Sequence, residues 1–368
     1  MAKNTRLISL DIFRGLTVAF MIFVITPGSW KYVYAQLRHA EWDGCTLTDL
    51  VFPFFLFIVG VSMWFSLKKY GHELNSGSFL RILRRTASIF ALGLFLNIFP
   101  HFFMDYSTLR IMGVLQRIAI AYCIGALICI TIRRDYLWIV LAVLLLFYWG
   151  LMGIFGSSDP YSLEGNFALK IDQLVLGKNH LYTGFGIPFE PEGLLSTITS
   201  VCTVIIGYYV GEIIGKKTAS GKTALKILLI AVAASGLGLL WNMVFPINKP
   251  LWTSSYVLYT GGTAMMIFSL IYFIVDVLKF QRWGTFFVVF GINALFAYFL
   301  ADIWTRLILL IQIPSGNFKL SLYTWIYEKL CVPVAGDMNG SLMFAIIQTL
   351  FIWVIVMMLY RKKIMIRL

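Results

Sequence analysis

Two apolar runs joined by a short polar loop open the chain, in RLISLDIFRGLTVAFMIFVITPGSWKYVYAQLRHAEWDGCTLTDLVFPFFLFIVGVSMWFS, residues 6–66. Each run has the roughly 20 mostly apolar residues that a helix needs to cross the hydrocarbon core of a bilayer. Ionisable side chains interrupt both runs, Asp11 and Arg14 in the first and Asp49 in the second. Because a charge inside a membrane is costly and usually serves a function, these residues are the first candidates for a site. The loop between the runs carries His39.

The composition indicates that the whole chain is a membrane protein. Of its 368 residues, 60% are hydrophobic and 13% are charged, and the mean hydropathy is +0.83. These values are too apolar for a soluble fold. The formal net charge is +13, but the basic residues lie in short clusters between apolar runs, where membrane topology needs them. We therefore expect an all-α polytopic membrane protein in a lipid bilayer, and no nucleic-acid partner.

The cysteines and the N-terminal run carry little further information. The five cysteines are scattered, odd in number and without a CxxC pair, so neither a disulfide nor a metal site is predicted. Charges interrupt the first apolar run, and no small-residue cleavage site follows it, so we expect this helix to be retained.

The apolar runs predict about ten membrane spans. They fall near residues 7–27, 46–67, 79–100, 112–132, 136–156, 193–214, 223–246, 255–278, 284–307 and 341–360. A further stretch, residues 321–334, is shorter and carries Glu328 and Lys329, so we expect an interfacial or re-entrant helix there. No separate soluble domain is evident, which favours a single transmembrane domain over residues 1–368.

The charge distribution predicts the orientation of these spans. With the N-terminus inside, 20 of the 30 basic residues but only 5 of the 17 acidic residues fall on the inner side. Since Lys and Arg concentrate on the cytoplasmic side of membrane proteins, we expect both termini to be cytoplasmic. The outward-facing loops are then residues 28–45, 101–111, 157–192, 247–254 and 308–340.

Several polar and aromatic residues share the predicted outer membrane depth. They are Trp30, His39, Trp42, Asp43, Asp49, Arg117, Glu192, Asn248, Lys249 and Trp252. In the fourth span small residues recur every four positions around Arg117, at Gly113, Ala121 and Gly125. Such a stripe lets helices approach closely, so we expect Arg117 to point into the bundle.

Each candidate also has a structural interpretation, which the sequence leaves open. Asp11 and Arg14, three residues apart, can form an intrahelical ion pair. Arg117 can neutralise Asp49, and a lone histidine such as His39 usually has a structural role. The tryptophans are typical of the membrane interface, at Trp30, Trp42 and Trp252. The third span carries three arginines that can serve as a topology signal, namely Arg81, Arg84 and Arg85.

Seven motifs occur in order along nearly the whole chain. They are SLDIFRGLTVAFMI, PGSW, HAEWDGCTLTDLVFPFFLFIVG, LQRIAIAY, FEPEGLLSTI, NKPLWTSSYVLYT and GINALFAY. Together they resemble the family of heparan-α-glucosaminide N-acetyltransferase and its bacterial relatives, within the transmembrane acyltransferase group. The resemblance is to the ten-span bacterial form.

The resemblance implies that cytoplasmic acetyl-CoA is the co-substrate and that its acetyl group passes to the amine of a glucosamine-type sugar on the periplasmic side. The family's catalytic histidine matches His39. A histidine can deprotonate an amine, or attack a thioester to give an acetyl-imidazole, while a partner sets its tautomer. Asp49 is the candidate for that partner. An acetyl-histidine intermediate and direct transfer both remain open.

The resemblance also implies sites for the two substrates. Candidates for binding the phosphates of CoA are Arg14, Arg84, Arg85 and Arg117. Candidates for binding the acceptor sugar are Trp42, Glu192, Asn248, Lys249 and Trp252, the last by stacking on a pyranose face. No metal is expected. The family further implies a homodimer in the bacterial cytoplasmic membrane.

One departure from the family pattern and one rival function complete the predictions. Ile25 stands where relatives usually carry a catalytic asparagine, and the hydroxyl of Thr26 lies one position away. A carrier of unmodified aminosugar is the alternative function. We find no inverted repeat between the halves of the chain, which transporters often show, so the sequence favours the enzyme.

Overall fold

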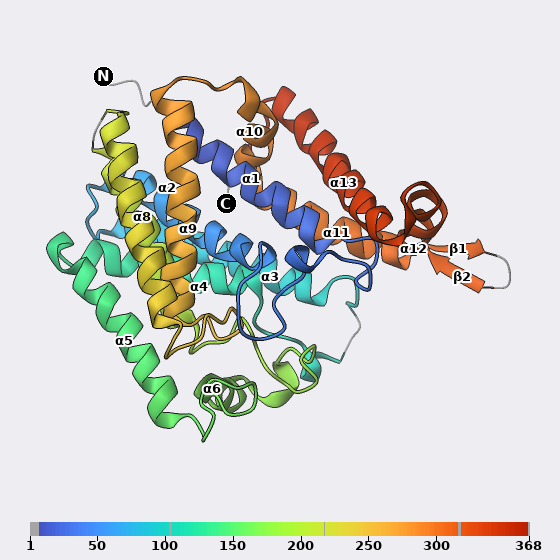
Figure 1. Ribbon diagram of the computed structural model, residues 1–368, viewed down its shortest axis with the longest axis horizontal. Coiled ribbons are helices and arrows are strands. Elements are labelled where there is room, and N and C mark those ends of the chain that lie inside the picture. The colour runs from blue at the N-terminus through green and yellow to red at the C-terminus, as the bar shows by residue number, and fades with distance from the viewer. Residues whose placement is uncertain (1–6, 103–104, 217, 316–317, 367–368) are drawn as a thin grey trace. The chain divides into compact units, whose positions relative to one another are not determined.

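Helices make up nearly all of the regular structure in the computed structural model, which describes residues 7–102, 105–216, 218–315 and 318–366 (Figure 1). Within these residues, eight helices are long and apolar enough to cross a membrane, and one bent pair of helices adds a ninth if it forms one span. The predicted all-α polytopic class is confirmed. The run predicted at residues 79–100 also forms a helix, α3, but its three arginines make it too polar to be counted among these spans.

The chain divides into two compact units. Unit 1 consists of Met1–His39, Thr46–Val51 and Ile274–Arg367. Unit 2 consists of Ala40–Cys45 and Phe52–Phe273. The candidate pair His39 and Asp49 therefore lies wholly within unit 1.

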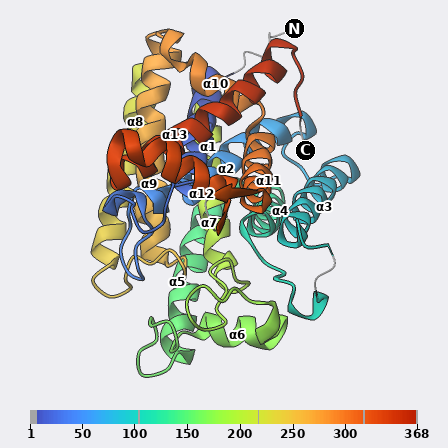
Figure 2. The ribbon, with the colours of Figure 1, turned by 90° about the vertical axis from the view of Figure 1, so that its right-hand side faces the viewer.

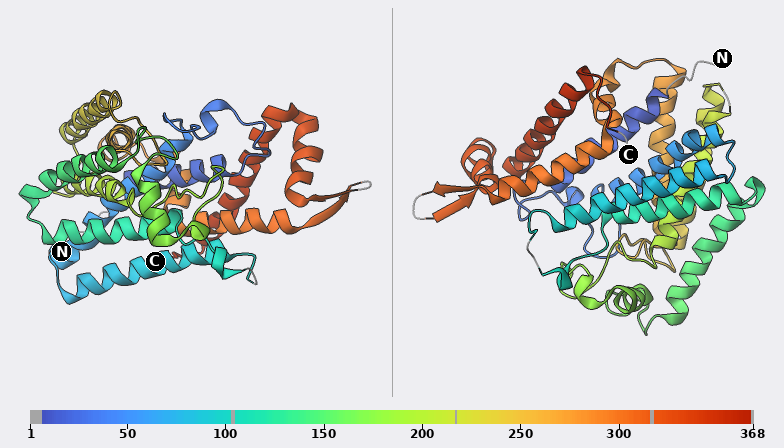
Figure 3. Two further views of the ribbon diagram at one scale, coloured as in Figure 1. Left: turned by 90° about the horizontal axis from the view of Figure 1, so that it is seen from below. Right: turned by 180° about the vertical axis from the view of Figure 1, so that it is seen from behind.

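Unit 1 combines the first helix of the chain with about its C-terminal quarter. Its α-helices and strands are α1 (Ile8–Ile25), α10 (Thr285–Ile292), α11 (Ala294–Leu310), β1 (Gln312–Ser315), β2 (Phe318–Ser321), α12 (Leu322–Ile326) and α13 (Val332–Arg361). The two strands pair antiparallel, and the hairpin projects beyond α11 and α12 (Figures 1 and 3). Helices α1 and α10 cross closely because Gly15 and Gly291 stand at the contact, where a Cβ would overlap the main chain of the other helix.

A sharp bend interrupts the ninth predicted span. Helices α10 and α11 meet at Asn293 with an angle of 70° between them. The Asn293 side chain is fully buried; its Nδ2 donates to the carbonyl of Ile364 (3.1 Å), and its Oδ1 accepts from the amide of Ile366 (2.9 Å). The polar groups of the bend are thus satisfied by the segment that follows α13, as a polar group in an apolar interior requires.

The short helix predicted near residues 321–334 is present. Helix α12 continues through the π-helix Tyr327–Cys331 into the start of α13. Gly336 then breaks the helical path, with φ of 73° and ψ of −179°. This left-handed φ costs little for glycine, which has no Cβ.

Unit 2 holds the remaining long helices. They are α2 (Val51–Leu67), whose first residue belongs to unit 1, α3 (Ser76–Ile98), α4 (Val114–Thr131), α5 (Leu137–Phe155), α6 (Phe167–Leu176), α7 (Thr197–Gly215), α8 (Gly221–Trp241) and α9 (Ser254–Tyr272). Helices α8 and α9 lie side by side (Figure 2), and α3 packs along α4 (Figure 3). Arg117 and Ala121 of α4 are fully buried, so the predicted inward direction of Arg117 is confirmed.

Candidate active site

His39 and Asp49 lie in direct contact. Nδ1 of His39 is 2.6 Å from Oδ1 of Asp49. The Asp49 side chain is 1% exposed, whereas the His39 side chain is 49% exposed. The pair therefore joins a buried carboxylate to a half-exposed imidazole, and the predicted contact between these two residues is confirmed.

The start of α2 positions the carboxylate. A 3-10 turn, Thr48–Leu50, leads into the helix. The segment Thr46-Leu-Thr-Asp49, which overlaps this turn, has the spacing of a capping box. Oδ2 of Asp49 lies 3.0 Å from the amide nitrogen of Thr46 and 3.0 Å from its hydroxyl oxygen. Both carboxylate oxygens of Asp49 are thus held, one by Thr46 and one by His39.

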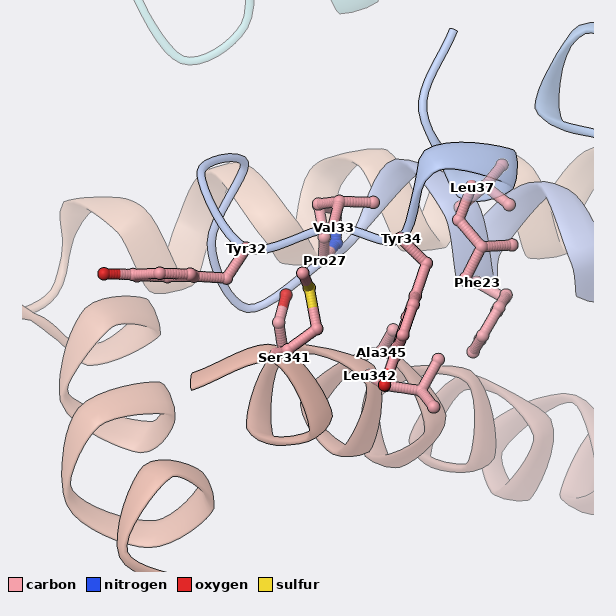
Figure 4. Close-up of a pocket in the computed structure, with 11 residues that line it drawn as sticks. Phe23, Pro27, Tyr32, Val33, Tyr34, Leu37, Ser341, Leu342 and Ala345 are labelled. Carbon is pink, nitrogen blue, oxygen red and sulfur yellow. The ribbon is translucent and has the colours of Figure 1, made fainter. Parts of the chain in front are cut away.

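The loop before His39 is anchored on α13 (Figure 4). The amide of Gly28 donates to the carbonyl of Ser341 (3.2 Å), the amide of Ser29 donates to Oγ of Ser341 (3.1 Å), and the hydroxyl of Tyr34 donates to Oδ1 of Asn339 (2.6 Å). Loop and helix enclose a pocket with about 270 Å³ of empty space and a mainly apolar lining. Ligand pockets usually present several convergent polar groups, which this mainly apolar lining lacks, so we interpret the pocket as part of the anchor.

The hydrogen bond to Asp49 determines what His39 can do. When Nδ1–H donates to a carboxylate, the neutral imidazole carries its basic electron pair on Nε2. This is the arrangement by which a buried aspartate orients the histidine of a hydrolase triad. Such a histidine can take a proton from an attacking amine, or attack an acyl carbon itself. In the described ranges, no group of three His, Cys, Asp or Glu side chains could hold a metal ion.

A second group of charges lies in unit 2, and we call Arg110, Glu190 and Glu192 the ionic cluster. The Arg110 guanidinium donates to both carboxylate oxygens of Glu190 (2.9 and 2.5 Å) and to Oε2 of Glu192 (2.7 Å). The Glu190 side chain is completely buried. Arg110 also lies over the ring of Tyr182, 4.7 Å from its centroid. Arg110 thus bonds to both carboxylates, and the cluster keeps one more negative than positive group.

The pKa values of the two glutamates of the ionic cluster are shifted in opposite directions. Burial raises the pKa of Glu190, and the bond with Arg110 opposes this effect only in part. Burial would also raise the pKa of Glu192, but the charges of Arg110, Arg117 and Lys249 together bring it below its ordinary value. Glu192 therefore carries a negative charge at neutral pH, as a group that attracts a cationic amine must.

Asp172 of α6 lies against the same segment. Its Oδ1 accepts from the amide of Leu194 (2.8 Å), and a Cβ at Gly193 would force its carboxylate to move. Burial raises the pKa of Asp172 to about 7. Arg117 lies nearby and donates to the carbonyl of Gly193 (3.1 Å) and to Oγ of Ser196.

Arg110, Glu190 and Asp172 were not among the candidate residues predicted from the sequence. A signal was present for Glu190, which stands two residues before Glu192 in the same FEPEG motif. Asp172 shares the buried face of the short helix α6 with Ala168 and Leu169, four and three residues earlier. We found no signal in the sequence for Arg110.

Asn248 supports the 40–45 loop from within unit 2. Its Nδ2 donates to the carbonyl of Trp42 and to Oδ1 of Asp43 (3.1 Å each), and its Oδ1 accepts from the amide of Leu251 (2.8 Å). Asn248 is fully buried and its amide is occupied, so it positions the loop in this structure. Trp42 is half-buried, and its Nε1 donates to the carbonyl of Tyr161 (2.8 Å).

Trp252 lies in the core of unit 2. It is 1% exposed, and its backbone φ of 50° is left-handed. Its ring contacts Phe52 and Tyr256 edge to face, at 4.9 and 5.2 Å between centroids, and the Arg117 guanidinium lies 5.1 Å from it. Such burial rules out both predicted roles of Trp252, at the membrane interface and in stacking on a sugar. Lys249, three residues earlier, is half-buried.

The predicted phosphate-binding arginines have different surroundings. Arg14 of unit 1 pairs with Asp11 (3.3 Å) and donates to the carbonyl of Gly291 (3.2 Å), which confirms the intrahelical ion pair. In unit 2, Arg84 is exposed on α3. Arg85 is half-buried over the ring of Tyr122 (4.7 Å), and its buried Nε has no hydrogen-bond partner among the described residues.

Thr26 does not supply the missing asparagine. It is buried, and its hydroxyl donates to the carbonyl of Ile22 in its own helix (2.8 Å). A hydroxyl that is bonded one turn back along the helix has given up its only proton. The donor that relatives usually carry at position 25 therefore has no replacement at Thr26.

Comparisons with known proteins point to one family. The model of "Heparan-alpha-glucosaminide N-acetyltransferase, catalytic" matches residues 6–164, which include His39 and Asp49. Human heparan-alpha-glucosaminide N-acetyltransferase is 30% identical over 355 residues, covering 81% of this chain and 53% of the human protein. The mouse protein of the same name is 29% identical over 358 residues, with the same two coverages. The chain thus spans about half the length of the curated relatives it matches.

Proposed function

Because the chain belongs to the family of proteins related to heparan-alpha-glucosaminide N-acetyltransferase, we propose that it is a membrane-embedded acetyltransferase. It takes the acetyl group of cytoplasmic acetyl-CoA and passes it to the amine of a glucosamine-type sugar on the periplasmic side. The observation that carries this proposal is the 2.6 Å contact between half-exposed His39 and buried Asp49. A histidine with only a structural role has no need of a buried acid and an accessible ring together.

His39 has two possible roles in the transfer. In direct transfer, Nε2 takes the proton of the sugar ammonium or amine, the amine nitrogen bonds to the acetyl carbon, and the carbon–sulfur bond breaks with the electron pair on sulfur. In the two-step route, Nε2 bonds to the acetyl carbon while the carbon–sulfur bond breaks with the electron pair on sulfur. The amine nitrogen then bonds to the acetyl carbon, the bond from that carbon to Nε2 breaks, and Nε2 takes the proton that the amine loses. In both routes Asp49 stabilises the positive charge that develops on the imidazole.

Arg84 and Arg85 are the best placed of the four arginines proposed to bind the phosphates of CoA. The Arg84 side chain is accessible. The Nε of Arg85 has no hydrogen-bond partner among the described residues, so it can donate to a phosphate without losing another bond. A guanidinium is well suited to phosphate because it donates two parallel hydrogen bonds. Arg14 would have to leave Asp11, and Arg117 would have to become accessible, so both are weaker candidates.

We assign the acceptor side to Trp42, Glu192 and Lys249. The negative charge of Glu192 attracts a sugar ammonium, and the accessible part of the Trp42 ring can stack on a pyranose. Asn248 and Trp252 support this side from beneath, since both are buried. The family resemblance supports a homodimer in a bacterial cytoplasmic membrane. The charge asymmetry supports the cytoplasmic position of both termini.

A carrier of unmodified aminosugar is the second candidate. The 70° bend between α10 and α11 is the kind of broken span on which transporters build binding sites. The amide of Asn293 at this bend, however, is bonded to the main chain of Ile364 and Ile366, which favours the enzyme.

Purified protein with radiolabelled acetyl-CoA and glucosamine tests the proposal. We expect labelled N-acetylglucosamine from the parent protein and its loss in His39→Ala. Counterflow of unmodified glucosamine into liposomes without CoA, together with no acetylation, would instead identify a carrier.

A further inference from the structure

Thr46 bonds to Asp49 and to Arg38, the residue before His39. Its amide donates to Oδ2 of Asp49 (3.0 Å), and its hydroxyl donates to the carbonyl of Arg38, the residue before His39 (2.6 Å). We propose that Thr46 is a positioning residue, which sets the distance and the orientation between the imidazole and the carboxylate. This inference rests on the proposed function, because it assigns Thr46 to the same site.

The hydroxyl of Thr46 is not used as in an ordinary capping box. There, the threonine hydroxyl accepts from the backbone amide three residues later. Here the amide of Asp49 donates to the main-chain carbonyl of Thr46 (3.1 Å) instead. The start of α2 therefore does not depend on the hydroxyl, which is available to hold the loop strand at Arg38.

The hydroxyl has one proton and two oxygen atoms within reach. The carbonyl of Arg38 is at 2.6 Å and Oδ2 of Asp49 is at 3.0 Å, so the shorter contact marks the Arg38 carbonyl as the acceptor. The Thr46 amide then holds Oδ2. One residue thus bonds near both ends of the segment from His39 to Asp49, which lie ten positions apart. A misplacement of about 1 Å can cost about 100-fold in rate. The two hydrogen bonds made by Thr46 therefore matter for catalysis.

Thr48 provides a matched control two residues away. It is a threonine of the same segment, buried where Thr46 is half-buried, and its Oγ1 has no hydrogen-bond partner among the described residues. Threonine to valine removes only the hydroxyl at either position and keeps the size of the side chain. The two substitutions therefore separate the loss of a bonded hydroxyl from the general effect of the exchange.

The kinetic test compares Thr46→Val, Thr46→Ser and Thr48→Val in the full-length protein. We expect Thr46→Val to lower kcat about 10- to 100-fold with little change in KM for acetyl-CoA or glucosamine. Thr46→Ser should recover most of the rate, because it restores the hydroxyl, and Thr48→Val should match the parent. Equal rates for the two valine variants, or no recovery with serine, would overturn the inference.

A spectroscopic test decides the role of Thr46 without acetyl transfer. In protein labelled with ¹⁵N-histidine, the His39 signals, assigned by their loss in His39→Gln, should show a proton on Nδ1 in the parent and in Thr48→Val. Thr46→Val should shift these signals towards a mixture of tautomers. If the parent transfers no acetyl group, the proposed function fails while this comparison still stands. Unchanged signals in a folded Thr46→Val protein would refute the role of Thr46.

Discussion

The His39–Asp49 pair and the ionic cluster use the same kind of charge-assisted hydrogen bond for different ends. In the pair, one buried carboxylate holds a ring that stays half-exposed. In the ionic cluster, Arg110 bonds to both glutamates, and the Glu190 side chain is fully enclosed. An arrangement that keeps one partner accessible can react with a substrate, whereas the enclosed bond between Arg110 and Glu190 chiefly holds the fold. Breaking the first should therefore reduce activity, and breaking the second should reduce stability.

Removal of the imidazole gives the largest expected effect. We expect His39→Ala to lower acetyl transfer at least about 10³-fold, since both routes require Nε2. The melting temperature should fall less than in the Arg110 variant described below, because His39 is half-exposed and water can replace its ring beside Asp49. His101→Ala, at an exposed histidine of unit 2, is the control and should retain the parent activity. A His39→Ala protein that keeps its full rate would remove the basis of the comparison.

Neutralising the carboxylate tests whether the pair works through orientation. Asp49→Asn keeps the size of the side chain but no longer offers a charged acceptor to Nδ1–H, so the imidazole can adopt the other tautomer. We expect kcat to fall roughly 10²- to 10⁴-fold while KM changes little. Steady-state kinetics over a range of both substrates measure this split. A fall confined to KM would instead place Asp49 in substrate binding.

The ionic cluster should respond in stability. Arg110→Met leaves two carboxylates without their shared partner, and loss of one member of a buried ion pair typically costs about 3–5 kcal/mol. Thermal unfolding in detergent should show a large drop in melting temperature. The control is Arg133→Met, which breaks an exposed pair with Asp135 at 3.7 Å and should leave the melting temperature unchanged. If both variants melt together with the parent, the cluster does not hold the fold.

Asp172 offers the smallest and most specific effect. Its pKa of about 7 in the folded protein lies above the ordinary value of 3.8, so folding favours the protonated form. The protonated Asp172 therefore contributes its full stabilisation of the folded protein below about pH 4. This contribution is lost as the pH rises to about 7. Asp172→Asn cannot ionise, so we expect it to be more stable than the parent above pH 7 and to lose this part of the pH dependence.

Melting temperatures of parent and variant between pH 4 and pH 8 test this expectation. The difference between the two curves should grow from pH 4 to pH 7 and then stay constant. Parallel curves would show that Asp172 has an ordinary pKa in the folded protein.

Local patterns predicted much of the fold and the core of the candidate site. The small-residue stripe of α4 placed Arg117 inside the bundle, and the spacing of Asp11 and Arg14 allowed the ion pair that forms. Asp49 was a candidate because a charge near the start of an apolar run is conspicuous. These features depend on residues within one or two helical turns, which is the range over which periodicity carries information.

Burial of loop residues could not be predicted in the same way. Trp252 had the composition of an interfacial or sugar-stacking residue, but Phe52 and Arg117 cover its ring. Asn248 had the chemistry of a ligand-binding amide, but it bonds to Trp42 and Asp43. In both cases the partners lie more than 100 positions away, and no local pattern indicates such contacts.

By itself, the sequence determined that this chain is a helical membrane protein with an acid and a histidine close to the same helix end, because hydropathy and short-range spacing are properties of the chain. Only the tertiary structure decided which polar groups stay accessible. The bonds from Arg110 to Glu190, which lies 80 residues later, and from Tyr34 to Asn339, which lies 305 residues later, exist because helices remote in sequence pack together. That packing depends on the shapes and charges of whole surfaces, which no single segment contains.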